Sequence, residues 1–148
     1  MITGNDRSSS NLKIAITVAA VVLCALLIRA ESSETHAARV NALLARDVVG
    51  MPGMQLTMST VEYPPGAGSA PHRHDAQVFV YVLEGHVIMQ VKGGPRMTLG
   101  PGETFYESPD DVHSVSANAS KTEPAKFLVF MVKDKNATTR PVAPEEAR

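Results

Sequence analysis

Short runs of apolar and β-branched residues alternate along the chain with turns rich in glycine and proline, and no long stretch repeats with a helical period. Short apolar runs bounded by such turns are typical of strands in an antiparallel sandwich or barrel. We predict about eight strands, at residues 40–49 (a strand or a short helix), 55–63, 78–83, 87–91, 96–99, 104–107, 113–118 and 125–132. Because no internal repeat is visible, the pattern predicts one all-β barrel of the jelly-roll class rather than two.

The N-terminal part has a different pattern. Residues 14–28 are fifteen uncharged residues, all of them apolar except Thr17, and they follow a polar start that carries Arg7 and Lys13. A membrane-spanning helix needs about 18 or more such residues, whereas the apolar core of an export signal is shorter. We therefore expect residues 1–30 to be an export signal or a membrane anchor helix, with a buried core helix as the alternative. The protein is then expected to be exported, to the periplasm or another extracytoplasmic space, either free or tethered to the inner membrane.

The rest of the chain divides into a polar linker at residues 31–39, a single folded domain at residues 40–135 and a flexible tail at residues 136–148. The formal net charge is -1 and the pI is near 6.5, so a nucleic acid partner is not expected. The single cysteine, Cys24, lies in the N-terminal apolar run. The folded part therefore has neither a disulfide nor thiol chemistry.

Two histidines, His72 and His74, stand one residue apart just before the strand-like run at residues 78–83. Side chains at i and i+2 of a strand project from the same face, so both imidazoles point into one space. Neutral imidazole is the commonest metal ligand in proteins. A third histidine, His113, lies in a second strand-like segment. Three converging imidazoles would form a metal centre with open coordination positions; the alternative is that they are structural residues of the core.

These residues and their spacing resemble the two sequence motifs of the cupin superfamily. The matching residues are Gly66, His72, His74 and Leu83-Glu84-Gly85 in the first motif, and Gly102 and His113 in the second. The resemblance covers roughly residues 40–135 and implies a small bacterial-type cupin with a three-histidine site. Its fold would be a single antiparallel jelly roll, or double-stranded β-helix. It also implies a bound divalent metal ion (Fe, Mn, Zn, Ni or Cu) and, by analogy, a homodimer.

Three positions depart from the cupin pattern. Val78 stands four residues after His74, where cupins usually place a glutamate ligand, and a valine side chain cannot bind a cation. The adjacent Gln77 faces the other way unless a β-bulge shifts the phase of the strand. In the second motif, Pro109 and Asn118 each stand one residue later than the family pattern places them. The expected metal ligands are therefore His72, His74, His113 and, if the strand is bulged, Gln77.

Glu107 stands five residues after Gly102, at a position that points inward in the cupin second motif. An inward carboxylate near His113 would act as a substitute metal ligand, as a general base, or as a hydrogen-bond partner of a ligating imidazole. The alternative is that the extra residue before Pro109 turns the side chain outward to solvent. If the protein is an enzyme, Glu107 is the expected catalytic residue.

The expected function is metal-dependent chemistry on a small oxygen-bearing molecule. The resemblance favours dioxygenase-type oxidation as the subtype, because three-histidine cupins include thiol and diketone dioxygenases. The competing hypothesis is a non-catalytic module that binds or senses a small molecule or a metal, and a third is a purely structural barrel. The expected partners are a small molecule and a second copy of the chain, with membrane contact only through the N-terminal segment.

Overall fold

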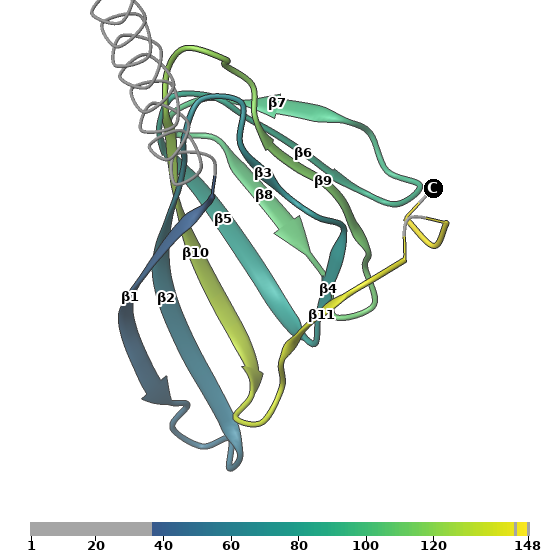
Figure 1. Cartoon of the computed structure of the whole chain (residues 1–148). Helices are drawn as coiled ribbons and strands as arrows, with labels where there is room; N and C mark the ends of the chain where they lie inside the picture. Colours follow the sequence, from purple (N-terminus) through teal and green to yellow (C-terminus); the bar gives the residue numbers. More distant parts are fainter. Residues whose placement is uncertain (1–36, 144, 148) are drawn as a thin grey trace, which may run out of the picture. The chain divides into compact units, whose positions relative to one another are not determined.

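The computed structural model describes residues 37–143 and 145–147, and in this part the chain forms eleven β-strands (Figure 1). The strands are β1 (Arg39–Asp47), β2 (Met54–Tyr63), β3 (Gly68–Ser69), β4 (His72–His74), β5 (Ala76–Glu84), β6 (Val87–Val91), β7 (Met97–Leu99), β8 (Thr104–Glu107), β9 (His113–Asn118), β10 (Ala125–Asp134) and β11 (Thr139–Pro141). They form two sheets in which every paired strand is antiparallel.

The first sheet has five strands in the order β1-β2-β10-β5-β8. At its centre, β10 pairs along its whole length with β2 and on its other side with β5. In β5 the side chains of Val78, Val80 and Val82 are buried, whereas the residues between them are exposed. This alternation is that of a strand with one face against the core and one face in solvent.

The second sheet has six strands, with the order β11-β4-β9-β6-β7 and β3 paired with β9. A β-bulge interrupts the pairing of β6 with β9, because Gln90 pairs with Val115 whereas Val91 pairs with His113. Ser114 is therefore the extra residue on β9, and its hydroxyl donates a hydrogen bond to the carbonyl of Gln90 at 3.1 Å. A bulge of this kind changes which side chains of a strand face the core.

The inward faces of the two sheets share one apolar core. Its buried residues come from the first sheet and from the second, and include Val78, Val80, Val82, Phe127 and Val129 on one side and Val87, Met89 and Leu99 on the other. Two antiparallel sheets packed face to face around a common core are the architecture of a jelly roll.

Gly85 carries the chain from the first sheet to the second, between β5 and β6. Its backbone has a φ of 67°, a conformation that residues with a Cβ rarely adopt. A Cβ at this position would also overlap the backbone of Pro124 and Ala125, where β10 begins. Both the turn and the close approach of the two chains therefore require glycine.

The structure confirms the all-β prediction and makes residues 40–49 part of a strand rather than a helix. It adds three short strands to the eight predicted ranges: β3, β11 and β4, which carries the histidine pair and lies in the other sheet from β5. Because β11 lies at residues 139–141, part of the predicted flexible tail is paired into the second sheet. The predicted N-terminal export or anchor segment lies outside the described residues. Within residues 37–143 and 145–147, no helix is long and apolar enough to cross a membrane.

We expect Gly85→Ala to lower the free energy of unfolding by about 3 kcal/mol, because the new methyl group meets backbone atoms at a positive φ. The matched control is Gly93→Ala, which also has a positive φ (79°) but has open space around it, and should cost about 1 kcal/mol. Chemical denaturation of the two variants measures the difference. Equal destabilisation would show that the close approach to β10 does not matter.

Candidate metal centre

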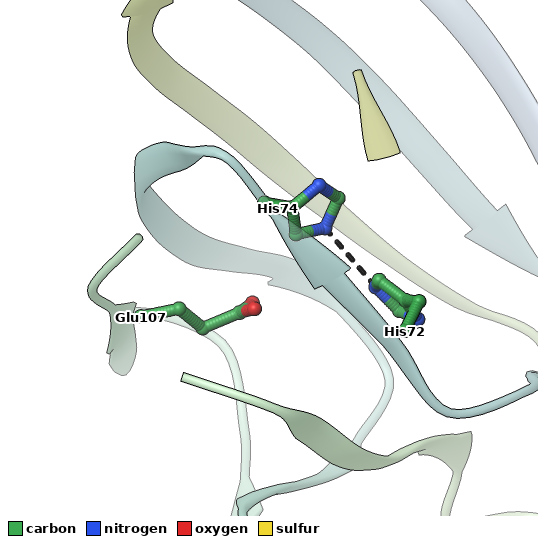
Figure 2. Close-up of side chains that lie close together, drawn as sticks. All are labelled: His72, His74 and Glu107. Atoms are coloured by element: carbon green, nitrogen blue, oxygen red, sulfur yellow. Dashed lines mark hydrogen bonds between the residues drawn. The ribbon is translucent and has the colours of Figure 1, made fainter. Parts of the chain in front are cut away.

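Three side chains from two strands converge on one point: His72 and His74 from β4, and Glu107 from β8 (Figure 2). One nitrogen of each imidazole and one oxygen of the carboxylate all lie within 4.8 Å of one another. The two imidazoles approach most closely, with 3.0 Å between their Nε2 atoms. Two nitrogens that each lie about 2.1 Å from one ion and bind it at a right angle are about 3.0 Å apart. The spacing therefore fits two ligands of a single metal ion.

The outer nitrogen of each of these imidazoles has a hydrogen-bond partner of its own. His72 Nδ1 lies 2.8 Å from the carbonyl oxygen of Ala70, which can only accept, so this nitrogen carries the hydrogen and Nε2 presents a lone pair. His74 Nδ1 lies 2.9 Å from the hydroxyl of Thr139 on β11. The carbonyl of Ala70 accepts only and so fixes the tautomer of neutral His72, whereas the hydroxyl of Thr139 can donate or accept and orients the ring of His74 in either tautomer.

His74 is held in its neutral form. Burial lowers the pKa of His74 to about 4; Glu107 opposes this shift, while His72 and His113 add to it. The deprotonated imidazole is the form that binds a metal. When His74 donates its Nδ1 hydrogen to Thr139, its Nε2 lone pair faces that of His72, and a cation is needed between them. In the other tautomer, His74 donates from Nε2 to His72 and the pair is satisfied without a cation.

Glu107 supplies the independent indication of a cation. Its side chain is 2% exposed, and Oε2 has no hydrogen-bond partner within the described residues. An ionised carboxylate at this depth costs on the order of several kcal/mol unless a positive charge or donors compensate it. The outward orientation considered from the sequence is therefore wrong, because Glu107 points inward and faces the two imidazoles (Figure 2).

The position of Glu107 also explains how the site can do without a carboxylate at Val78. Val78 on β5 and Glu107 on β8 are directly opposite each other in the antiparallel pair. Directly opposite residues project from the same face with their Cβ atoms about 5 Å apart. A carboxylate on β8 therefore reaches almost the same space as one on β5 would.

His113 lies beside this cluster but is not one of its three converging groups. It is 4% exposed, its ring centroid is 5.1 Å from that of His72, and its Nδ1 is 3.0 Å from Glu107 Oε1. The angles at that contact are not those of a hydrogen bond, and neither ring nitrogen has another partner in the described part of the chain. Buried nitrogens without partners call for a ligand or an ion close by.

Gln77 is not brought to the site. It is exposed on β5, and the pairing of β5 with β10 continues without interruption through Gln77 and Val78. The bulge that would have turned Gln77 inward is absent at this point, so its side chain faces away from the cluster. The alternation of side chains along β5 therefore places Gln77 on the solvent-facing side of the strand.

Thr139 is a site residue that the sequence did not indicate. It lies in the segment predicted as a flexible tail, and only its pairing with His74, across β11 and β4, brings it to the imidazole. The adjacent Arg140 binds the carboxylate of Asp75 at 2.6 Å and so helps to fasten β11 beside β4. No sequence signal marks this contact, because it joins residues 65 positions apart.

The cluster lines a cavity of about 330 Å³ between the two sheets. Most of the wall is apolar, with side chains from both sheets: Val61, Val78, Val80, Met89, Phe127, Val129 and Met131. A cavity of this size with a few convergent polar groups is typical of a small-molecule site.

Residues 59–131 match the family model described as Cupin domain. This matched segment contains both histidines of β4, Glu107 and His113. The chain therefore contains a cupin domain, as the two sequence motifs suggested. Among curated proteins, no sequence relative of the chain was found.

Solved structures with the same fold include an oxalate oxidase, with a TM-score of 0.57 and 24% identity over 74% of this chain and 57% of that one. The DMSP lyase DddQ from Ruegeria pomeroyi DSS-3 has a TM-score of 0.60 and 21% identity over 73% of this chain and 53% of its own. A cupin superfamily protein from Desulfitobacterium hafniense DCB-2 has a TM-score of 0.56 and 14% identity over 69% and 83%. The chain spans little more than half the length of the first two, and these likenesses show the fold alone.

We expect Thr139→Val to weaken the binding of a divalent metal about tenfold, because it removes the hydroxyl that orients His74 while keeping the shape of the side chain. The matched control is Thr138→Val, at the neighbouring exposed position. Isothermal titration of the metal-free protein with Zn²⁺ measures both. Equal affinities in the two variants would contradict an orienting role for Thr139.

Proposed function

We propose that the protein is a metal-binding cupin in which His72, His74 and Glu107 hold a divalent cation, with His113 as a fourth ligand. The observation that carries this proposal is the convergence of two imidazole nitrogens and a buried carboxylate oxygen that has no partner among the described residues. The inclusion of His113 is supported by its two buried ring nitrogens, neither of which has a hydrogen-bond partner among the described residues. Imidazole and carboxylate together suit Fe, Mn, Zn, Ni and Cu.

The charge of this ligand set defines what else the site would bind. Three neutral imidazoles and one carboxylate leave a divalent site with a net charge of +1. A monoanionic oxygen ligand, such as an enolate or a phenolate, would neutralise it and occupy the open positions. A bound metal would polarise such an oxygen or activate water or dioxygen, while the apolar walls exclude bulk water.

The activity we propose is dioxygenase-type oxidation of a small oxygen-bearing molecule. The alternative is a binding or sensing module without turnover. The apolar cavity beside the cluster supports both equally, because it offers room for an organic molecule. In the alternative, the missing carboxylate at Val78 is a sign that turnover has been lost while the fold remains.

We expect the protein to bind close to one divalent metal ion per chain, and Glu107→Val to weaken that binding at least about tenfold, because it removes a charged ligand. His72→Ala should abolish stoichiometric binding. The exchange Val78→Glu/Glu107→Val moves the carboxylate across the strand pair at constant composition, and should recover part of the affinity lost in Glu107→Val. Elemental analysis and metal titration give the occupancy and the affinity.

The control is Glu84→Gln, which removes an exposed carboxylate at the end of β5. It should leave metal binding unchanged. Full metal affinity in both His72→Ala and Glu107→Val would refute the proposed site and favour a structural barrel. Oxygen uptake by the metal-loaded protein with catechols, thiols and diketones then separates enzyme from binder: no uptake with any of them favours the binding module.

We also propose that the protein is exported. The support for this is the run of fifteen uncharged residues at 14–28 after a start that carries Arg7 and Lys13. Residues 1–36 fused to alkaline phosphatase, which is active only outside the bacterial cytoplasm, should give an active reporter. Leu23→Arg, which places a charge in the apolar run, should abolish that activity; an inactive unaltered fusion would contradict export.

A further inference from the structure

Three hydroxyl groups form a short chain on the wall of the same cavity: Ser116 on β9, Tyr63 on β2 and Ser69 on β3. Tyr63 Oη lies 3.2 Å from Ser69 Oγ and 2.8 Å from Ser116 Oγ. Tyr63 is 3% exposed and Ser116 is 5% exposed, so the shorter bond is enclosed. These hydroxyls form a second group of polar side chains on the cavity, besides the proposed metal ligands. The rest of the wall is largely apolar.

The direction of these bonds leaves Ser116 with unused capacity. Tyr63 has a single hydroxyl hydrogen and donates it to Ser69, so Ser116 must donate the shorter bond to Tyr63. A serine hydroxyl that donates its hydrogen keeps two lone pairs. Within residues 37–143 and 145–147, Ser116 Oγ has no other hydrogen bond. A buried acceptor that faces a cavity is placed to receive a hydrogen bond from a bound molecule.

The bulge in β9 is what brings Ser116 and His113 to the same cavity. Residues three apart on a regular strand face opposite sides of the sheet. The extra residue, Ser114, restores the phase, so that both His113 and Ser116 are buried and line the cavity. Because His113 and Ser116 pair with Val91 and Met89, which are two residues apart on β6, roughly 7 Å of strand separates the metal end of the cavity from the hydroxyl end.

The charges along the wall limit what fits between the two ends. Among the residues that the structure describes, no lysine or arginine lines the cavity, and the only acidic side chain on it is that of Glu107. A second negative charge on a bound molecule would therefore have no cation to pair with at the Ser116 end. Burial of an unpaired charge is costly, whereas a hydroxyl or an amide N–H needs only an acceptor.

We propose that the Ser116–Tyr63–Ser69 chain is a recognition subsite for the far end of the ligand. The ligand class is a small molecule with an anionic oxygen at the metal, an apolar body, and an uncharged hydrogen-bond donor that Ser116 accepts. This inference rests on the proposed function, because the metal cluster fixes the other end of the molecule. It disfavours dicarboxylates as ligands of this cavity.

The test uses the full-length protein loaded with Zn²⁺, which is redox-inert, and three 3-hydroxypyridin-4-ones as probes. These bidentate monoanionic chelators differ only in the group on the ring nitrogen: 2-hydroxyethyl, propyl or carboxymethyl. Isothermal titration gives the three affinities, and the zinc content is checked before and after. The unaltered protein should bind the hydroxyethyl probe about five- to tenfold more tightly than the propyl probe, and the carboxymethyl probe most weakly.

In Ser116→Ala the preference for hydroxyethyl over propyl should fall to less than twofold. In the control Thr104→Val, which removes an exposed hydroxyl from β8, the preference should be unchanged. The subsite is overturned if the unaltered protein binds the hydroxyethyl and propyl probes equally, if the carboxymethyl probe binds most tightly, or if Ser116→Ala keeps the full preference. Zinc binding without binding of any probe also overturns the subsite but leaves the metal centre standing. Failure to bind zinc overturns the proposed function and the subsite together.

Discussion

The burial of Glu107 is the constraint on which the rest of the site depends. A carboxylate in an apolar cavity is stable only when positive charge or hydrogen-bond donors surround it, yet Glu107 Oε2 has no donor among the described residues. The nearest groups are imidazole nitrogens, and the lone pair of His72 Nε2 is turned toward the same space. A divalent cation satisfies the carboxylate and the imidazoles at once. The apolar walls then define the space in which an organic ligand would meet that cation.

The site also shows that two neighbouring strands of a sheet can each bring a carboxylate to the same place. The cupin pattern places its carboxylate on the strand that follows the histidine pair, where this chain has Val78. Glu107 lies directly across the strand pair on the same face. Because opposite side chains of an antiparallel pair share nearly the same space, the carboxylate can change strands while the surrounding core remains the same.

Two local features, a β-bulge and a short strand pairing, complete the arrangement. The bulge at Ser114 gives β9 one extra residue between His113 and Asn118, which accounts for the late position of Asn118 in the second motif. Asn118 remains buried, and its amide donates hydrogen bonds to the carbonyls of Tyr63 and Glu123 at 3.1 and 2.8 Å. On the other side of the cluster, the pairing of β11 with β4 brings Thr139 to His74. The bulge and the β11–β4 pairing thus each add a hydroxyl to the cavity, that of Ser116 and that of Thr139.

The sequence by itself determined the all-β class, most of the strands, and the convergence of His72 and His74, because alternation and turn residues act over a few positions. It left two orientations of Glu107 and two faces for Gln77 open, since the phase of a strand depends on whether a bulge interrupts its pairing. Only the tertiary structure decided that Glu107 points inward, that Gln77 points outward and that Thr139 contacts His74. These orientations and this contact depend on the register and packing of strands that are far apart in the chain, which no local pattern encodes.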